Sequence, residues 1–110
     1  MLIAVASKDG KEINQHFGHA ERFLIYEVSD GTARMVAEKK VERYCSFDPE
    51  HPLRMHILKG IAEALAGCRA VVTAQMGEHP KVELERLGIE PYMIEGDIET
   101  TLVDLAKILS

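Results

Sequence analysis

An Asp-Gly pair at positions 30 and 31 lies between two stretches that are rich in branched and aromatic residues. Asp-Gly in a two-residue connection favours a type I′ turn, which joins neighbouring antiparallel strands. We therefore expect a β-hairpin with strands at residues 23–28 and 33–41. The second strand carries lysines and other polar residues, which suits the edge of a sheet.

The remaining apolar runs are short, and helical patterns lie between them. Buried strands are expected at residues 2–7 and 70–74, and a strand containing a proline at 89–94. Apolar residues at helical spacing predict three helices, which begin near Asp48–Pro52, Pro80 and Asp97, with Gly67 and Gly88 closing the first two. The order is β-β-β-α-β-α-β-α. It predicts one α/β domain over residues 1–110, with a five-stranded mixed sheet flanked by helices on both faces.

Composition and charge exclude several classes of protein. The net charge of −5 disfavours a general nucleic-acid binder, because such a protein needs a basic face. Apolar runs are far shorter than the roughly 20 residues that span a bilayer, and the first residues do not resemble a signal peptide. Cys45 and Cys68 form no CxxC pair, so we expect free thiols and a cytoplasmic protein without nucleic-acid or membrane partners.

The segment between the first two strands carries His16 and His19, with Phe17 and Gly18 between them. Neutral imidazole is a common metal ligand, so the pair is a candidate binding site. The carboxyl ends of strands collect at one edge of such a sheet. We therefore expect the His16 segment to meet two others, which follow the third and fourth strands and carry Tyr44, Cys45 and His51, and Gln75, Met76, Gly77 and His79, respectively.

Three stretches of the chain resemble a known family. The run Asn14–Tyr26 matches the pattern HFG-x-A-x-x-F-x-I-Y, Val41–Cys45 matches V-E-x-Y-C, and Cys68–Pro91 is similar to the family's second half. Together they resemble the nitrogenase iron–molybdenum cofactor biosynthesis family, whose members include the carriers NifX and NafY and the C-terminal domain of NifB. The chain departs from the NifB-type Gly-x-Gly-Pro loop at His79, where a small residue is usual.

The resemblance implies a ribonuclease H-like fold and a role in nitrogen fixation without a catalytic step. It implies binding of an iron–sulfur cluster or an iron–molybdenum cofactor precursor, held for transfer between donor and acceptor proteins. His16 is the expected metal ligand, with Cys45 and His19 as secondary ligands. The other expected contacts to the cofactor are Phe17, Gly18, Arg22, Arg43 and Gly77. Phe17 is also expected in the core and Cys68 in a structural position. His16→Ala is expected to change stability by about 0.5 kcal/mol or less.

Other functions remain open on the sequence alone. A metal-free regulatory or interaction module of the same fold is the main alternative. A nuclease of this fold would need acidic residues from the first strand onward to hold Mg²⁺, and residues 2–7 contain none. A small-molecule enzyme could use His16 as a general base, for which Asp9 is the nearest carboxylate in the sequence.

Overall fold

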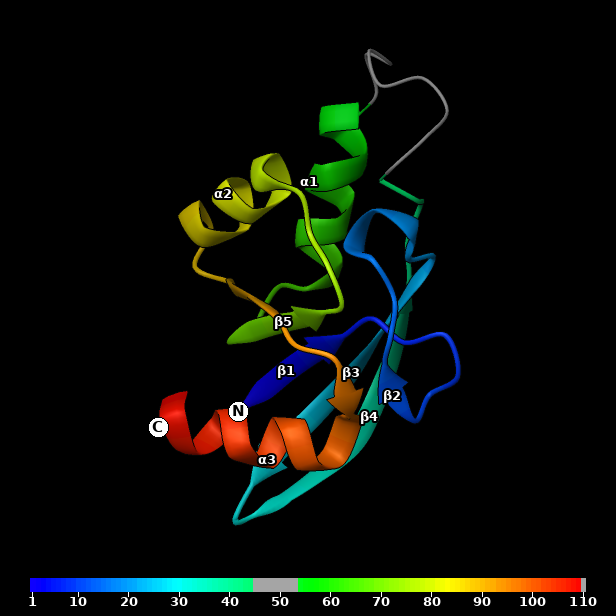
Figure 1. The fold of residues 1–110 in the computed structure, drawn as a ribbon. Coiled ribbons are helices and arrows are strands. Elements are labelled where there is room, and N and C mark those ends of the chain that lie inside the picture. Colours follow the sequence, from blue (N-terminus) through cyan, green and yellow to red (C-terminus); the bar gives the residue numbers. More distant parts are fainter. Residues whose placement is uncertain (45–53, 110) are drawn as a thin grey trace.

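A computed structural model describes residues 1–44 and 54–109 of the chain, without the side chains of residues 54 and 55. Its main element is a five-stranded sheet with the order β4-β3-β1-β5-β6 (Figure 1). The strands are β1 (Leu2–Val5), β3 (Arg22–Ser29), β4 (Thr32–Lys40), β5 (Ala70–Thr73) and β6 (Glu90–Met93). The five strands that the sequence predicts are therefore all present.

The short apolar strand β1 lies at the centre of the sheet. It pairs antiparallel with β3, where Ala4 lies opposite Ile25, and parallel with β5, where Ala4 lies opposite Val71. Its residues Ile3, Ala4 and Val5 are all fully buried, which explains why the run shows no alternation of polar and apolar residues. The mixed sheet is confirmed.

The hairpin of β3 and β4 has the predicted turn. Asp30 and Gly31 both have a positive φ, of 51° and 76°, as a type I′ turn requires. β4 is an edge strand, as its polar residues indicated, and its register with β3 shifts between Ile25 and Tyr26. Because β4 is antiparallel to β3, it runs in the same direction as β1, so both strands end at the same edge of the sheet.

The opposite edge of the sheet is β6, which contains Pro91. The backbone N–H groups of Glu90 and Ile94 donate to the carbonyls of Arg69 and Thr73. Alternate residues of a strand face opposite neighbours, so the nitrogen of Pro91 faces the open edge, where no N–H is needed. The expectation of an edge strand here is confirmed.

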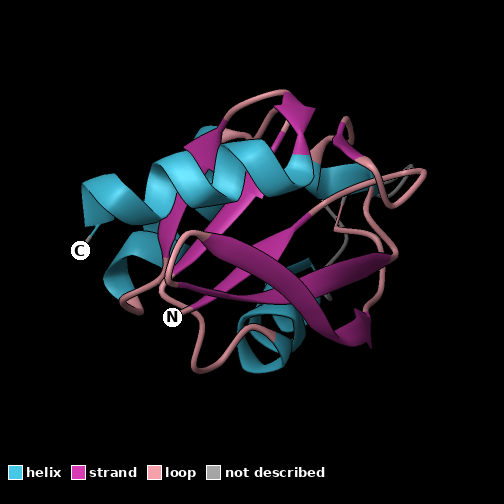
Figure 2. Cartoon of the chain, turned by 90° about the horizontal axis from the view of Figure 1, so that it is seen from below, coloured by secondary structure: helices cyan, strands magenta, loops and turns pink. Residues whose placement is uncertain are grey.

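Helices cover both faces of the sheet, as predicted. α1 (Arg54–Ala64) and α2 (Glu78–Arg86) lie on one face, and α3 (Ile98–Leu109) lies on the other (Figure 1). Figure 2, which shows the molecule from below, places α3 across the strands. Each face has its own core. The first core includes Phe17, Phe23, Ile61, Leu65 and Leu84, and the second includes Ile13, Val72, Ile98, Leu102 and Leu105.

Three helix ends follow the sequence signals, whereas the start expected near Asp48–Pro52 lies outside the described residues. The Asp97 carboxylate accepts a hydrogen bond of 2.9 Å from the backbone N–H of Thr100, and this contact holds the pKa of Asp97 below its ordinary value. Gly67 and Gly88 follow the first two helices with positive φ angles of 90° and 86°. Both conformations favour glycine and end the helices where the sequence predicts.

Three short elements escaped the sequence patterns. β2 (Glu12–Ile13) and β7 (Gly96–Asp97) form a separate two-stranded sheet, and η1 (Phe17–His19) is a single turn of 3₁₀ helix. Strands of two residues are too short to show an alternation of polar and apolar side chains, so β2 and β7 could not be predicted from such a pattern. β2 brings Ile13 into the second core, and β7 leads directly into α3.

The structure describes one of the two cysteines. Cys68 is buried at 6% exposure with a free thiol, and burial raises its pKa, in agreement with a structural position. Cys45 lies outside the described residues.

In residues 1–44 and 54–109, no helix is long and apolar enough to cross a membrane.

Two leucines allow a matched test of this core. Leu102 of α3 is fully buried, whereas Leu87, just after α2, is 54% exposed. Leu102→Ala should lower the free energy of unfolding by about 2–5 kcal/mol, because it removes buried contacts and leaves a cavity. Leu87→Ala should change it by about 0.5 kcal/mol or less. Urea titration of both variants measures the difference, and equal effects would contradict the placement of α3.

Candidate functional site

The segment that carries His16 is fixed to the segment that follows β5. The Phe17 N–H donates to the Gln75 carbonyl at 2.8 Å, and the Ala74 N–H donates to the Gln15 carbonyl at 3.0 Å. At the same place, His16 and Gln75 form a parallel β-bridge. The segments after β1 and β5 therefore meet at the carboxyl edge of the sheet, as the sequence predicts.

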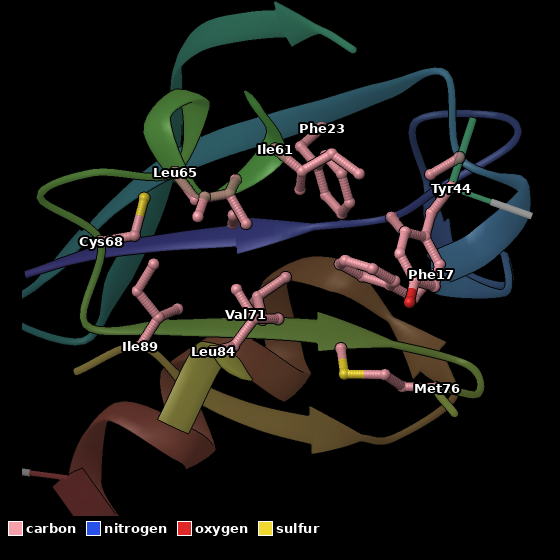
Figure 3. Close-up of a cluster of buried hydrophobic side chains, with 14 of the residues drawn as sticks. Phe17, Phe23, Tyr44, Ile61, Leu65, Cys68, Val71, Met76, Leu84 and Ile89 are labelled. Carbon is pink, nitrogen blue, oxygen red and sulfur yellow. The ribbon is translucent and has the colours of Figure 1, made fainter. Parts of the chain in front are cut away.

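Phe17 is the apolar anchor of this junction. Its side chain is fully buried, and its ring lies 5.7 Å from the ring of Phe23 and 6.0 Å from that of Tyr44, between ring centroids. Figure 3 shows Phe17, Tyr44 and Met76 at one end of the core cluster and Cys68 at the other. The core position of Phe17 is confirmed. Tyr44 shows that the segment after β4 starts at the same edge.

His16 has a structural role that its sequence position did not reveal. Its Nδ1 accepts a hydrogen bond of 2.8 Å from the backbone N–H of Gly18 and so caps η1 at its start. The His19 N–H donates to the His16 carbonyl at 3.1 Å, which completes the turn. An acceptor at Nδ1 assigns the proton of a neutral ring to Nε2. In the sequence, the only signal of this cap is an acceptor side chain two residues before a glycine.

Two effects favour the neutral form of the His16 ring. Partial burial lowers the pKa of His16 below its ordinary value, and the neighbouring His19 lowers it further. The two imidazole rings lie 4.9 Å apart between centroids and are tilted by 32°. His16 is partly buried, whereas His19 is exposed. A neutral imidazole is the form that binds metal, and the turn places the rings of His16 and His19 side by side.

The two arginines expected near the site are already in ion pairs. Arg22 Nη1 lies 3.3 Å from Glu38 Oε2, and Arg43 Nε lies 4.0 Å from Glu21 Oε1. Arg22 also lines a hollow of about 480 Å³ beside η1. The hollow is lined by Ser7, Lys8, Gln15, His19, Glu21, Arg22, Glu38 and Lys40. Cationic side chains therefore gather next to the histidine turn, together with two carboxylates.

The remaining expected site residues differ in how far the structure places them. Gly77 is exposed and is the N-cap residue of α2, on the segment that Gln75 fixes to the His16 turn. A Cβ atom there would meet only Pro80, at 3.8 Å, so space does not require glycine. Cys45 and His51 lie outside the described residues. Within the described part of the chain, no three His, Cys, Asp or Glu side chains are grouped to hold a metal ion.

Asp9, the carboxylate considered as a partner for His16, serves its own turn. Its Oδ1 accepts hydrogen bonds from the backbone N–H groups of Lys11, at 2.9 Å, and Glu12, at 3.1 Å. These bonds lower the pKa of Asp9. The His16 ring instead accepts a hydrogen bond from the Gly18 backbone.

The cap corrects the expected stability effect of a change at His16. His16→Ala should lower the free energy of unfolding by about 0.5–2 kcal/mol, because the Gly18 N–H loses its acceptor. His16→Asn should recover most of that loss, since asparagine is a good capping residue without an imidazole ring. Urea titration of the two variants tests this, and equal destabilisation would show that the cap contributes nothing.

The lowered pKa of His16 also predicts a pH dependence. Its unfolded value is near 6.5 and its folded value is lower, so the unfolded chain binds the proton more readily. The stability contribution is therefore complete above about pH 6.5 and is lost as pH falls through the folded pKa. Between pH 7.5 and 5, the wild-type protein should lose stability relative to His16→Asn. A constant difference between the two melting temperatures would refute the shift.

Comparison with known proteins supports the resemblance over nearly the whole chain. Residues 1–108 match the family model described as dinitrogenase iron-molybdenum cofactor. The FeMo cofactor biosynthesis protein NifB of Azotobacter vinelandii is 41% identical over 91 residues, which are 83% of this chain and 18% of that protein. NifB of Frankia alni is 38% identical over 109 residues, which are 99% of this chain and 21% of that protein.

The chain thus spans about a fifth of the length of these curated relatives. A solved structure, that of PH0822, matches with a TM-score of 0.64 at 19% identity and covers 94% of this chain and 87% of the other. At that identity the match supports the α/β fold alone. The family model and the NifB relatives show more: this chain belongs to the dinitrogenase iron-molybdenum cofactor family.

Proposed function

We propose that this domain carries an iron–sulfur cluster or an iron–molybdenum cofactor precursor during metallocluster biosynthesis. It takes this cargo from a donor protein and delivers it to an acceptor protein, with no catalytic step of its own. The observation that carries the proposal is the placing of His16, a partly buried neutral imidazole, where the segments after β1 and β5 meet. Membership of a family named for this cofactor supports it.

In this account His16 is the first metal ligand and His19 the second. Their rings are close enough to approach one cargo from the same turn. Cys45, which follows Tyr44 in the sequence, is the third proposed ligand. A site with few ligands suits a carrier, because a closed set of four cysteines would hold a cluster too firmly to release it.

The ion pairs beside the turn fit an anionic cargo. Arg22 and Glu38 are each more than a third exposed, and both Arg43 and Glu21 are more exposed still. Such surface pairs contribute only about 0–1 kcal/mol each. The arginines can therefore turn from their carboxylates toward an anionic cluster at little cost. Gly77 completes the proposed contacts from the neighbouring segment.

Anaerobic reconstitution with iron and sulfide tests this function. The wild-type protein should retain iron and sulfide after desalting, with the visible absorption of a cluster. His16→Asn keeps the cap and removes the imidazole, so cluster retention should fall by about tenfold or more while the protein stays folded. His19→Asn and Cys45→Ser should each cause a smaller loss.

The matched control is His56→Asn, which removes an exposed imidazole from α1. This variant should retain as much cluster as the wild-type protein. Equal retention in His16→Asn and the wild type would refute His16 as the ligand. A wild-type protein that retains no iron would overturn the carrier function and leave the metal-free interaction module as the better account.

A further inference from the structure

The hydrogen bond between Gly18 and His16 conflicts with metal binding by the same ring. The Gly18 N–H donates to Nδ1 at 2.8 Å, so Nδ1 uses its lone pair for this bond. A metal at Nδ1 would take that lone pair. A metal at Nε2 of a neutral ring would leave the proton on Nδ1, where it would face the Gly18 proton. Either ring nitrogen, acting as a ligand, ends the hydrogen bond to Gly18.

The Gly18 amide cannot simply follow the ring, because its peptide unit is fixed on both sides. The Phe17 carbonyl, in the same peptide unit, accepts from the Ala20 N–H at 3.3 Å. The preceding Phe17 N–H donates to Gln75. Phe17 and Ala20 are both fully buried. When the ring turns away, the N–H of Gly18 therefore stays in place and needs a new acceptor, since Gly18 itself is buried.

We propose that this amide donates a hydrogen bond to the cargo: when His16 becomes a ligand, the Gly18 N–H passes from Nδ1 to an acceptor atom of the bound group. The proposal rests on the carrier function and adds a chemical preference to it. The cargo must carry hydrogen-bond acceptors beside its metal, as the sulfides of a cluster do. A hydrated metal ion can bind His16 but leaves the amide to water.

Hydrogen exchange of single amides, read by NMR on the whole chain, tests this. Zn²⁺ serves as a diamagnetic probe, and the ¹⁵N shifts of the His16 ring report its saturation. In the free protein the ring should carry its proton on Nε2 and the Gly18 amide should exchange slowly. At zinc saturation Gly18 should exchange about tenfold faster or more, while Ala20, bonded to Phe17, should not change.

The reconstituted cluster gives the second measurement, with exchange stopped by acid, which also strips the cluster. The Gly18 amide should exchange about as slowly as in the free protein, because the cluster accepts its hydrogen bond. His16→Asn is the matched control. Its side chain keeps an acceptor for Gly18 and lacks the ring, so zinc should leave the exchange rate unchanged.

A proton on Nδ1 of His16 in the free protein would overturn the inference. So would a Gly18 exchange rate, or His16 ring ¹⁵N shifts, that zinc does not change. Fast exchange of the Gly18 amide in the cluster-loaded form would also overturn it. The carrier function fails by a different result, which is the absence of retained iron in the reconstituted wild type. A protein that holds its cluster through His16 with Gly18 exposed to solvent would keep the function and lose only this contact.

Discussion

The burial of Phe17 is the interaction on which the histidine turn depends. Its ring lies in the core against Phe23 and Tyr44, and its N–H is bound to the segment after β5. Full burial of such a side chain contributes about 1.5–3 kcal/mol, and its truncation typically costs about 3–5 kcal/mol. The neighbouring cap between His16 and Gly18 contributes about 0.5–2 kcal/mol. The cap can therefore open while Phe17 stays anchored in the core.

This difference in strength would let one turn serve both the fold and the proposed cargo. A ligand loop that was held only by its ligand would be disordered when empty and would lose conformational entropy at each loading. Here the burial of Phe17 and its hydrogen bond to Gln75 fix the backbone of the turn even without the His16 cap. In the proposed carrier, loading would only have to reorient the His16 ring and exchange surface ion pairs at Arg22 and Arg43. Both steps would cost little free energy, as reversible binding requires.

Sequence patterns predicted the sheet and helices because these depend on local signals and burial. The Asp30-Gly31 turn, the apolar run of β1 and the Asp97 cap each had a recognisable chemistry. The meeting of the His16 and Gln75 segments followed from the direction of the strands. The pairing of β2 with β7 joins residues distant in the chain by two-residue strands, and no local pattern encodes it. The cap at His16 was missed because the motif suggested a ligand and histidine is not a usual capping residue.

The identity of the atoms bound to the metal tests the account most directly. Electron–nuclear double resonance on the reduced, cluster-loaded protein detects nitrogen ligands, and ¹⁵N-labelled histidine identifies them as imidazole. We predict a histidine nitrogen coupled to the cluster in the wild-type protein and its loss in His16→Asn, with residual coupling from His19 where that ring also binds. A loaded wild-type cluster without nitrogen coupling, or an unchanged coupling in His16→Asn, would contradict the assignment of His16 as the ligand.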